Sequence, residues 1–254
     1  MSAIALLDAE RIKLSTTRSP VWTAVAVAGL SLGLAAIQGS AAYGAAPLPP
    51  EKAALGVAVF GVPVLMVLAA MTVTGEYRSG MIRTTFMATP NRSLVLVAKA
   101  VVAALFSGVY TALMVIGAVL TAGMAAPPVV GVESHLSLAA AETWRTVGAI
   151  ALFGLLTAVL GVGVGALLRH AAGAVAVLLM WPLVAEPILG NLPNIGSEVG
   201  PYLPFGNAFL FTRVQWLYPV YDMRWGELGS LLYFAAVVAV VFAAAIVVVN
   251  RRDA

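Results

Sequence analysis

The sequence predicts an all-α membrane protein with six transmembrane helices. Of its 254 residues, 61% are hydrophobic and only 10% are charged, and the mean hydropathy is +0.99. A soluble domain carries about 25% charged residues, which keep its surface solvated, so the bilayer must be the main solvent of this chain. The charged residues are also grouped, and they leave uncharged runs close to the roughly 20 residues that cross the hydrocarbon core.

Each span is placed in a gap between charged residues, and five of the gaps accommodate a full helix. The remaining run, 171–189, is short, and we expect it to kink at Trp181-Pro182, because a proline ring clashes with the preceding helical turn. The expected spans are about 21–42, 53–74, 101–124, 146–168, 171–189 and 228–250. They form a single transmembrane domain over residues 1–254, which begins with an interfacial helix over residues 1–19.

The distribution of Lys and Arg predicts the orientation. With six spans, both termini share one side of the membrane with the loops after spans two and four. That side carries ten of the 14 Lys and Arg residues, and the other side carries four. Because cytoplasmic loops are enriched in Lys and Arg, we expect a multi-pass protein of the cell membrane with both termini in the cytoplasm.

The sequence contains few residues that indicate catalytic chemistry. The chain has no cysteine and no G-x-x-x-x-G-K-[ST] phosphate cradle. The glycines Gly161 and Gly165 lack the spacing of a dinucleotide fingerprint and favour close helix packing instead, as do Gly29 and Gly33. We assign no catalytic, cofactor-binding or metal-binding residue, and we expect that the chain is not an enzyme.

Two weaker signals leave alternatives open. Glu133 and His135 share an outer loop and could bind a metal, although a solvated loop is the simpler interpretation. No span carries the central Asp, Glu or Lys expected of an ion-coupled carrier. Glu186 comes closest, near the outer end of its span.

The stretch from 75 to 99, GEYRSGMIRTTFMATPNRSLVLVAK, carries most of the functional information. We expect Gly75 to break span two and Gly80 to allow a second turn. A short helix from Ser79 to Thr89 should end at Pro90. Helical spacing places four of its residues on one side: Met81, Ile82, Thr85 and Phe86. Such a helix predicts a docking element, and the alternative is a loop whose charge merely sets topology.

This stretch resembles the cytoplasmic loop of type-2 ABC transporter permeases. In that family the loop reads Gly-Glu, a basic residue, Gly, a short helix, Pro, Arg and then a Lys at the next span. The matching residues are Gly75, Glu76, Arg78, Gly80, Pro90, Arg92 and Lys99, with Met81 where many relatives have Thr. Residues 9–20 resemble the family's N-terminal interfacial helix, with Glu10, Lys13, Leu14 and Arg18 in its pattern.

The resemblance implies a membrane subunit of an ATP-driven exporter. In the family this loop is a coupling helix that fits a cleft of the ATPase subunit. ATP and Mg would be bound by that separate polypeptide, and a second permease subunit, identical or paired, would complete the substrate path. The implied ATPase-coupling residues are Gly75, Glu76, Tyr77, Arg78, Ser79, Gly80, Met81, Ile82, Arg83, Phe86, Pro90 and Arg92.

The last outer loop has an uncharged stretch, VGPYLPFGNAFLFT over 199–212, which is too short to span and suits a re-entrant or interfacial segment. It is followed by four aromatic residues typical of the headgroup level: Trp216, Tyr218, Tyr221 and Trp225. The candidate path or gate residues are Glu186, Pro204, Phe205 and Asn207. For Glu186 we weigh two possibilities. It faces the dimer interior or bonds to backbone in 190–212, or it reaches headgroup water.

Two other functions remain open at this point: a non-transporting membrane scaffold or assembly factor, and a secondary transporter. Few polar residues lie within the spans, which favours a lipophilic or amphipathic cargo. No feature indicates a nucleic-acid partner. If the chain is a permease, we expect spans one and five, with segment 199–212, to approach the second subunit.

Overall fold

The computed structural model describes residues 3–42, 48–127, 136–214 and 222–251, and every regular element within them is a helix. Six of these helices are long and apolar enough to cross a membrane, which confirms the predicted all-α membrane fold. The elements are α1 (Ala3–Thr16), α2 (Arg18–Ser40), α3 (Pro50–Ala53), a π-helical turn (Val57–Gly61) continuous with α4 (Val62–Ser79), α5 (Met81–Ala88), α6 (Arg92–Ala125), α7 (Ala141–Leu168), α8 (Ala171–Met180), a second π-helical turn (Trp181–Ala185), α9 (Glu186–Asn191), α10 (Gly196–Val199), a 3₁₀ turn (Gly200–Tyr202), α11 (Pro204–Thr212) and α12 (Glu227–Arg251).

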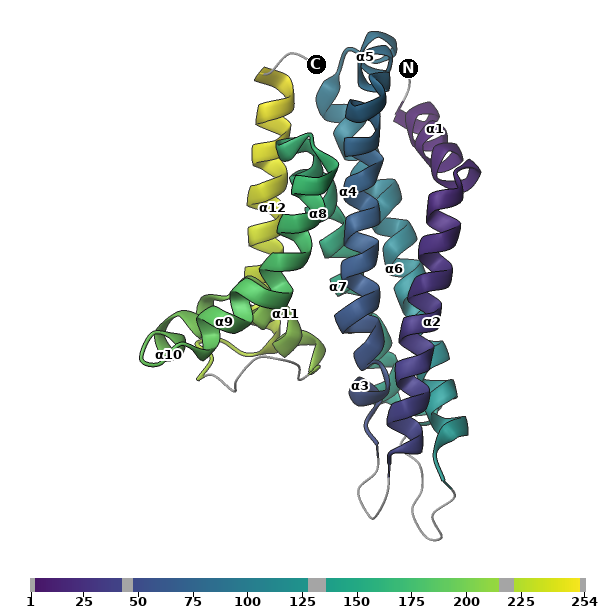
Figure 1. The fold of residues 1–254 in the computed structure, drawn as a ribbon, viewed down its shortest axis with the longest axis vertical. Coiled ribbons are helices and arrows are strands. Elements are labelled where there is room, and N and C mark those ends of the chain that lie inside the picture. Colours follow the sequence, from purple (N-terminus) through teal and green to yellow (C-terminus); the bar gives the residue numbers. More distant parts are fainter. Residues whose placement is uncertain (1–2, 43–47, 128–135, 215–221, 252–254) are drawn as a thin grey trace.

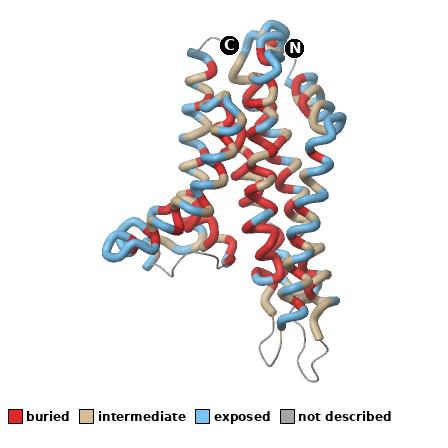
Figure 2. Tube along the Cα trace, viewed as in Figure 1, coloured by how far each residue is buried: buried red, intermediate tan, exposed pale blue. Residues whose placement is uncertain are grey.

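The spans form an elongated bundle with α4 and α7 at its centre (Figures 1 and 2). In the most apolar part of each span, 72% of the residues are buried in α4 and 61% in α7. The buried share of the corresponding part is 22% in α2, in the fifth span and in α12. The three peripheral spans therefore leave most of their apolar surface for lipid or for another protein.

Two glycines allow α4 and α7 to pack closely. A Cβ atom at Gly161 would overlap the carbonyl group of Met66, and one at Gly165 would lie 2.8 Å from the carbonyl oxygen of Ala70. The predicted close packing is thus confirmed for these two positions. At Gly29 and Gly33 no such contact exists within the described chain, because a Cβ atom at either would meet nothing within 4 Å.

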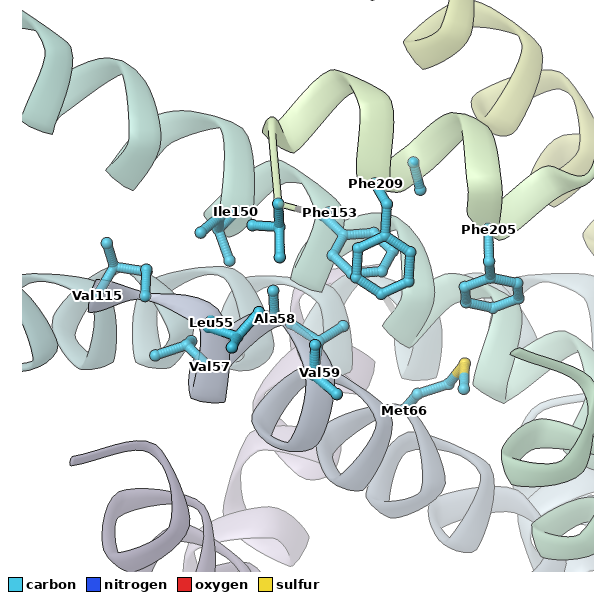
Figure 3. Close-up of a cluster of buried hydrophobic side chains, with 14 of the residues drawn as sticks. Leu55, Val57, Ala58, Val59, Met66, Val115, Ile150, Phe153, Phe205 and Phe209 are labelled. Atoms are coloured by element: carbon cyan, nitrogen blue, oxygen red, sulfur yellow. The ribbon is translucent and has the colours of Figure 1, made fainter. Parts of the chain in front are cut away.

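A group of aromatic rings fixes α11 against the bundle (Figure 3). The ring of Phe153, on α7, lies 6.3 Å from that of Phe205 and 5.7 Å from that of Phe209, both on α11. Its distance to the ring of Phe234, on α12, is 5.8 Å. Aromatic pairs at these separations add to the stability gained by burial, so the 199–212 stretch is packed helix rather than loop.

The two ends of the bundle differ in what they carry (Figure 1). One end, called here the α5 end, holds α1, α5, the end of α12 and both chain termini. The other, called the α3 end, holds α3 and the last turns of α2 and α6. Both termini therefore share one end, as six spans require.

Several boundaries differ from the expected ones. Gly75 does not break span two, because α4 continues through it to Ser79 and ends at Gly80, whose φ of 72° lies in the left-handed region. The third span begins at Arg92 rather than near 101, after the Asn91 side chain caps the helix by accepting a hydrogen bond from the Leu94 amide. Span two starts at Val57, after the separate helix α3.

The fifth span runs from Ala171 to Asn191. Its π-helical turn starts at Trp181, the residue where the sequence predicts a kink, and the chain changes direction there so that α9 leaves the bundle sideways (Figure 1). A proline in a helix removes one backbone hydrogen bond, and Pro182 is the second residue of this turn.

Candidate functional site

Four charged side chains meet at the α5 end and form a closed ring of ion pairs. The Lys99 ammonium lies 2.8 Å from Glu10 and 2.7 Å from Glu76, and the Lys13 ammonium lies 2.8 Å from each of the same two carboxylates. Acid and base alternate around the ring, so its formal charge is zero. We call Glu10, Lys13, Glu76 and Lys99 the charge ring.

Apolar packing brings the ring together from three helices. Leu6 on α1 is buried with Val95 and Ala98 on α6. Because residues four apart share one face of a helix, this contact places Glu10 one turn beyond Leu6, beside Lys99. Glu76 reaches the same point from the last turn of α4.

Most of the ring is removed from solvent. Lys99 is 1% exposed, Glu10 5% and Glu76 7%, measured on the side chains. Because α6 starts at Arg92, Lys99 lies inside this helix and is covered by α1. Removing one partner of a buried pair leaves an uncompensated charge and costs about 3–5 kcal/mol, so each member of the ring depends on the others.

Lys13 is the most accessible member, with 39% of its side chain exposed. Burial by itself lowers the pKa of Lys13, but its hydrogen bonds to Glu10 and Glu76 and their negative charges outweigh burial and raise the pKa above its ordinary value. Its stabilising contribution is therefore complete below the ordinary lysine pKa and is lost only as the pH rises through the raised value. Lys13 therefore remains charged at neutral pH.

Helix α5 is attached beside the ring. The Thr85 hydroxyl donates a long hydrogen bond of 3.5 Å to Glu76, and Ile82 is buried. The guanidinium of Arg92 lies 5.2 Å from the Phe86 ring centre and donates to the Val249 carbonyl oxygen at 3.2 Å. These contacts connect α5 directly to α4 and α6, and Arg92 continues the connection from α6 to α12.

The other side of α5 is exposed. Met87 is 75% exposed and Met81 is 48% exposed, and Arg83 is also at the surface. The sequence placed Met81 on one side of this helix with Ile82, but in the structure Ile82 is buried while Met81, which opens the helix directly after the Gly80 turn, is exposed. Two methionines and an arginine thus project from the end of the molecule.

The remaining loop residues have smaller roles. Tyr77 is half-buried, and the Arg169 guanidinium lies 4.9 Å from its ring centre, which connects α4 to the short joint between α7 and α8. The Ser79 hydroxyl donates to the Glu76 carbonyl oxygen at 3.3 Å. Arg78 and Pro90 are exposed, as is Arg18 at the start of α2.

A second polar cluster lies where the fifth span meets α11, and Glu186 is its centre. The Glu186 carboxylate is completely buried and accepts hydrogen bonds from the backbone amides of Phe205 and Gly206, at 2.9 and 3.1 Å, and from the Trp181 indole at 2.7 Å. The positive end of a helix dipole favours a carboxylate at this place. Of the two interpretations of Glu186, backbone bonding is confirmed and headgroup exposure is wrong.

Neighbouring groups extend this cluster. The Asn207 amide donates to the carbonyl oxygens of Pro201 and Leu203, and its oxygen accepts from the Trp225 indole at 2.7 Å. Pro204 begins α11. These residues brace the turn before α11, so the four path or gate candidates form a packed junction.

The opposite end of α11 meets positive charge. Arg145 donates to the Phe211 carbonyl oxygen at 3.0 Å and pairs with Glu227, the first residue of α12. Arg213 also pairs with Glu227, and this hydrogen bond raises the pKa of the arginine. A carboxylate at the start of α11 and a guanidinium at its end both complement the helix dipole.

Some predicted features lie outside the described residues: Glu133 and His135, and the aromatic residues Trp216, Tyr218 and Tyr221. Sequence reasoning missed the charge ring as a unit. A signal existed, since Lys99 sits seven residues inside a long apolar helix and a charge in such a place requires a partner. No protein-family model matches the chain, and no curated protein matches it.

Proposed function

We propose that this chain is the membrane-spanning subunit of an ATP-driven exporter and that α5 couples it to a separate ATPase subunit. ATP and Mg are bound by that partner, which accords with the lack of a phosphate-binding motif in this sequence. A second permease subunit completes the substrate path. Both termini and α5 are on the cytoplasmic side of the cell membrane.

One observation carries the proposal. A short helix projects from the end of a six-span bundle with exposed Met81, Arg83 and Met87, while its opposite side is attached to the spans α4 and α6. Methionine and arginine are enriched at protein interfaces. A partner that pushes on α5 would thus act directly on the spans.

The charge ring supports the same function. It lies beside α5, where α1, α4 and α6 meet, and includes Glu76, three residues before α4 ends. Buried ion pairs are directional and demand accurate geometry, so the ring keeps α1, α4 and α6 in register at the place where a coupling partner would act. The largely apolar spans favour a lipophilic or amphipathic cargo.

The experiment is purification of the tagged protein from its native membranes, followed by measurement of ATP hydrolysis in the purified sample. Met87→Glu should abolish the hydrolysis that accompanies the protein, because a charge replaces the most exposed apolar side chain of α5, and should leave membrane abundance unchanged. The matched control is Met124→Glu, since Met124 is 88% exposed at the end of α6 remote from α5. Equal hydrolysis in the two variants would refute the proposal.

A further inference from the structure

A cavity of about 370 Å³ lies beside the charge ring, between α1, the start of α2, α4 and α6. Small-molecule sites span about 300–1,000 Å³, so its size suits a ligand group. One wall is charged and consists of the ring and Arg78. The other is apolar and includes Leu14, Pro20, Leu68, Met71, Val102 and Ala103.

The charged wall has spare positive capacity. The ring is neutral, so Arg78 gives the wall a net formal charge of +1. Arg78 is exposed and has no hydrogen bond or ion pair within the described part of the chain. Lys13 uses two of its three N–H donors on Glu10 and Glu76. An anionic group could therefore bind Arg78 and the third Lys13 donor without breaking the ring.

The apolar wall leads away from these charges along a membrane-spanning helix. Met71 is 42% exposed, and Leu68, one turn earlier on α4, is 5% exposed. Both lie within the span Val57–Ser79, on the side of Glu76 that points toward the middle of the bundle. A ligand that fills the cavity must be charged at the α5 end and apolar farther along α4.

We propose that the cavity binds an anionic phospholipid from the leaflet at the α5 end, with the phosphate at Arg78 and Lys13 and the first part of an acyl chain along Leu68 and Met71. The lipid fills the space between α1 and α4 and braces the ring from its accessible side. This inference requires only that the helices span a bilayer, and it is independent of the proposed export function.

Native mass spectrometry of the purified, delipidated protein tests the headgroup contact. Phosphatidylglycerol should bind more tightly than phosphatidylcholine, and Arg78→Gln should weaken phosphatidylglycerol binding about fivefold, as expected for one basic residue near an anionic lipid surface. The matched control Arg251→Gln removes an exposed charge at the same end and should have no effect. Equal binding of the two lipids, or equal loss in both variants, would overturn the site.

Further measurements test the contact with the acyl chain and exclude other occupants of the cavity. Met71→Trp should reduce phosphatidylglycerol binding by filling the apolar wall, whereas Leu105→Trp, at a 59% exposed position of α6 outside the cavity, should not. Inorganic phosphate should fail to displace the lipid, because phosphate has no acyl chain to fill the apolar wall. Displacement by phosphate would indicate a free-anion site. Disulfide formation between two chains carrying Met71→Cys would indicate that a second subunit covers the cavity, and either result contradicts the proposal.

Discussion

The Nζ atom of Lys99, in the third membrane-spanning helix, lies 2.8 Å from Oε2 of Glu10, in an N-terminal helix outside the bundle. The two residues are 89 positions apart in the chain, and both are almost completely buried. Since a lone buried charge is strongly unfavourable, this pair makes the position of α1 an obligatory part of the folded bundle.

The first expected outcome concerns charge balance within the ring. Lys99→Met leaves two buried carboxylates with Lys13 alone, and the free energy of unfolding should fall by about 3–5 kcal/mol. Adding Glu10→Gln restores neutrality and should recover part of that loss. Thermal unfolding of the purified variants in detergent measures both effects.

The exposed pair of Arg11 and Asp8 provides the control for this cycle. Its atoms are 3.6 Å apart and both side chains are more than half exposed, so Asp8→Asn should have little effect on the unfolding temperature. If the double variant unfolds at the same temperature as Lys99→Met alone, the ring members are not coupled.

The second prediction concerns the contact between α4 and α7. Gly161→Ala places a methyl group against the Met66 carbonyl, so the two central helices must move apart, at a cost of about 1–3 kcal/mol. Gly148→Ala, on the same helix with open space around it, should be neutral or stabilising, because alanine favours helix. Thermal unfolding should separate the two variants. Similar unfolding temperatures would show that the close approach is unimportant.

The third prediction concerns the buried carboxylate of Glu186. In Glu186→Gln an amide replaces a carboxylate that accepts three hydrogen bonds, so an N–H₂ group must face a donor or turn away from it. A buried group left unsatisfied costs about 1–3 kcal/mol, and membrane abundance and unfolding temperature should fall. The exposed Glu198 is the comparison, and Glu198→Gln should behave as wild type. Normal abundance with altered transport would instead assign Glu186 a role in gating.

The fourth prediction concerns the proposed second subunit. Cysteine introduced at Val25 on α2 or Val184 in the fifth span should form disulfides between chains, because both positions are exposed on peripheral spans. The chain has no native cysteine to interfere. Leu152→Cys, on the central helix α7, should remain monomeric on a non-reducing gel. Crosslinking through Leu152 alone would contradict the proposed seam.

The sequence predicted the number of spans because charge and hydropathy act locally and can be read along the chain. It also predicted the turn at Gly80 and the site of the fifth-span kink, where a single residue type determines backbone geometry. Gly75 was misassigned, since a glycine inside an apolar helix costs only about 1 kcal/mol and packing outweighs it. Boundaries moved where helices extend beyond the hydrocarbon, as at Arg92.

The two polar clusters depend on contacts that local patterns do not encode. Glu10, Glu76 and Lys99 come from three helices, and Glu186 meets amides 19 and 20 residues farther along. Each is recognisable in the sequence as a charge in or near an apolar run, which requires a partner. Which partner it finds depends on how the helices cross.

The two polar clusters also determine how force could travel through the chain. The charge ring holds α1, α4 and α6 at one end, and Glu186 and Arg145 hold α9, α11 and α7 near the other. The tightly packed α4 and α7 connect the helices held by the two polar clusters, so the bundle should tilt as one rigid body. At 1.5 Å per residue the 34 residues of α6 extend about 51 Å, and a tilt of about 5° displaces the far end by about 4 Å. A small rotation imposed at α5 would thus move the far end of α6 by about the width of one side chain.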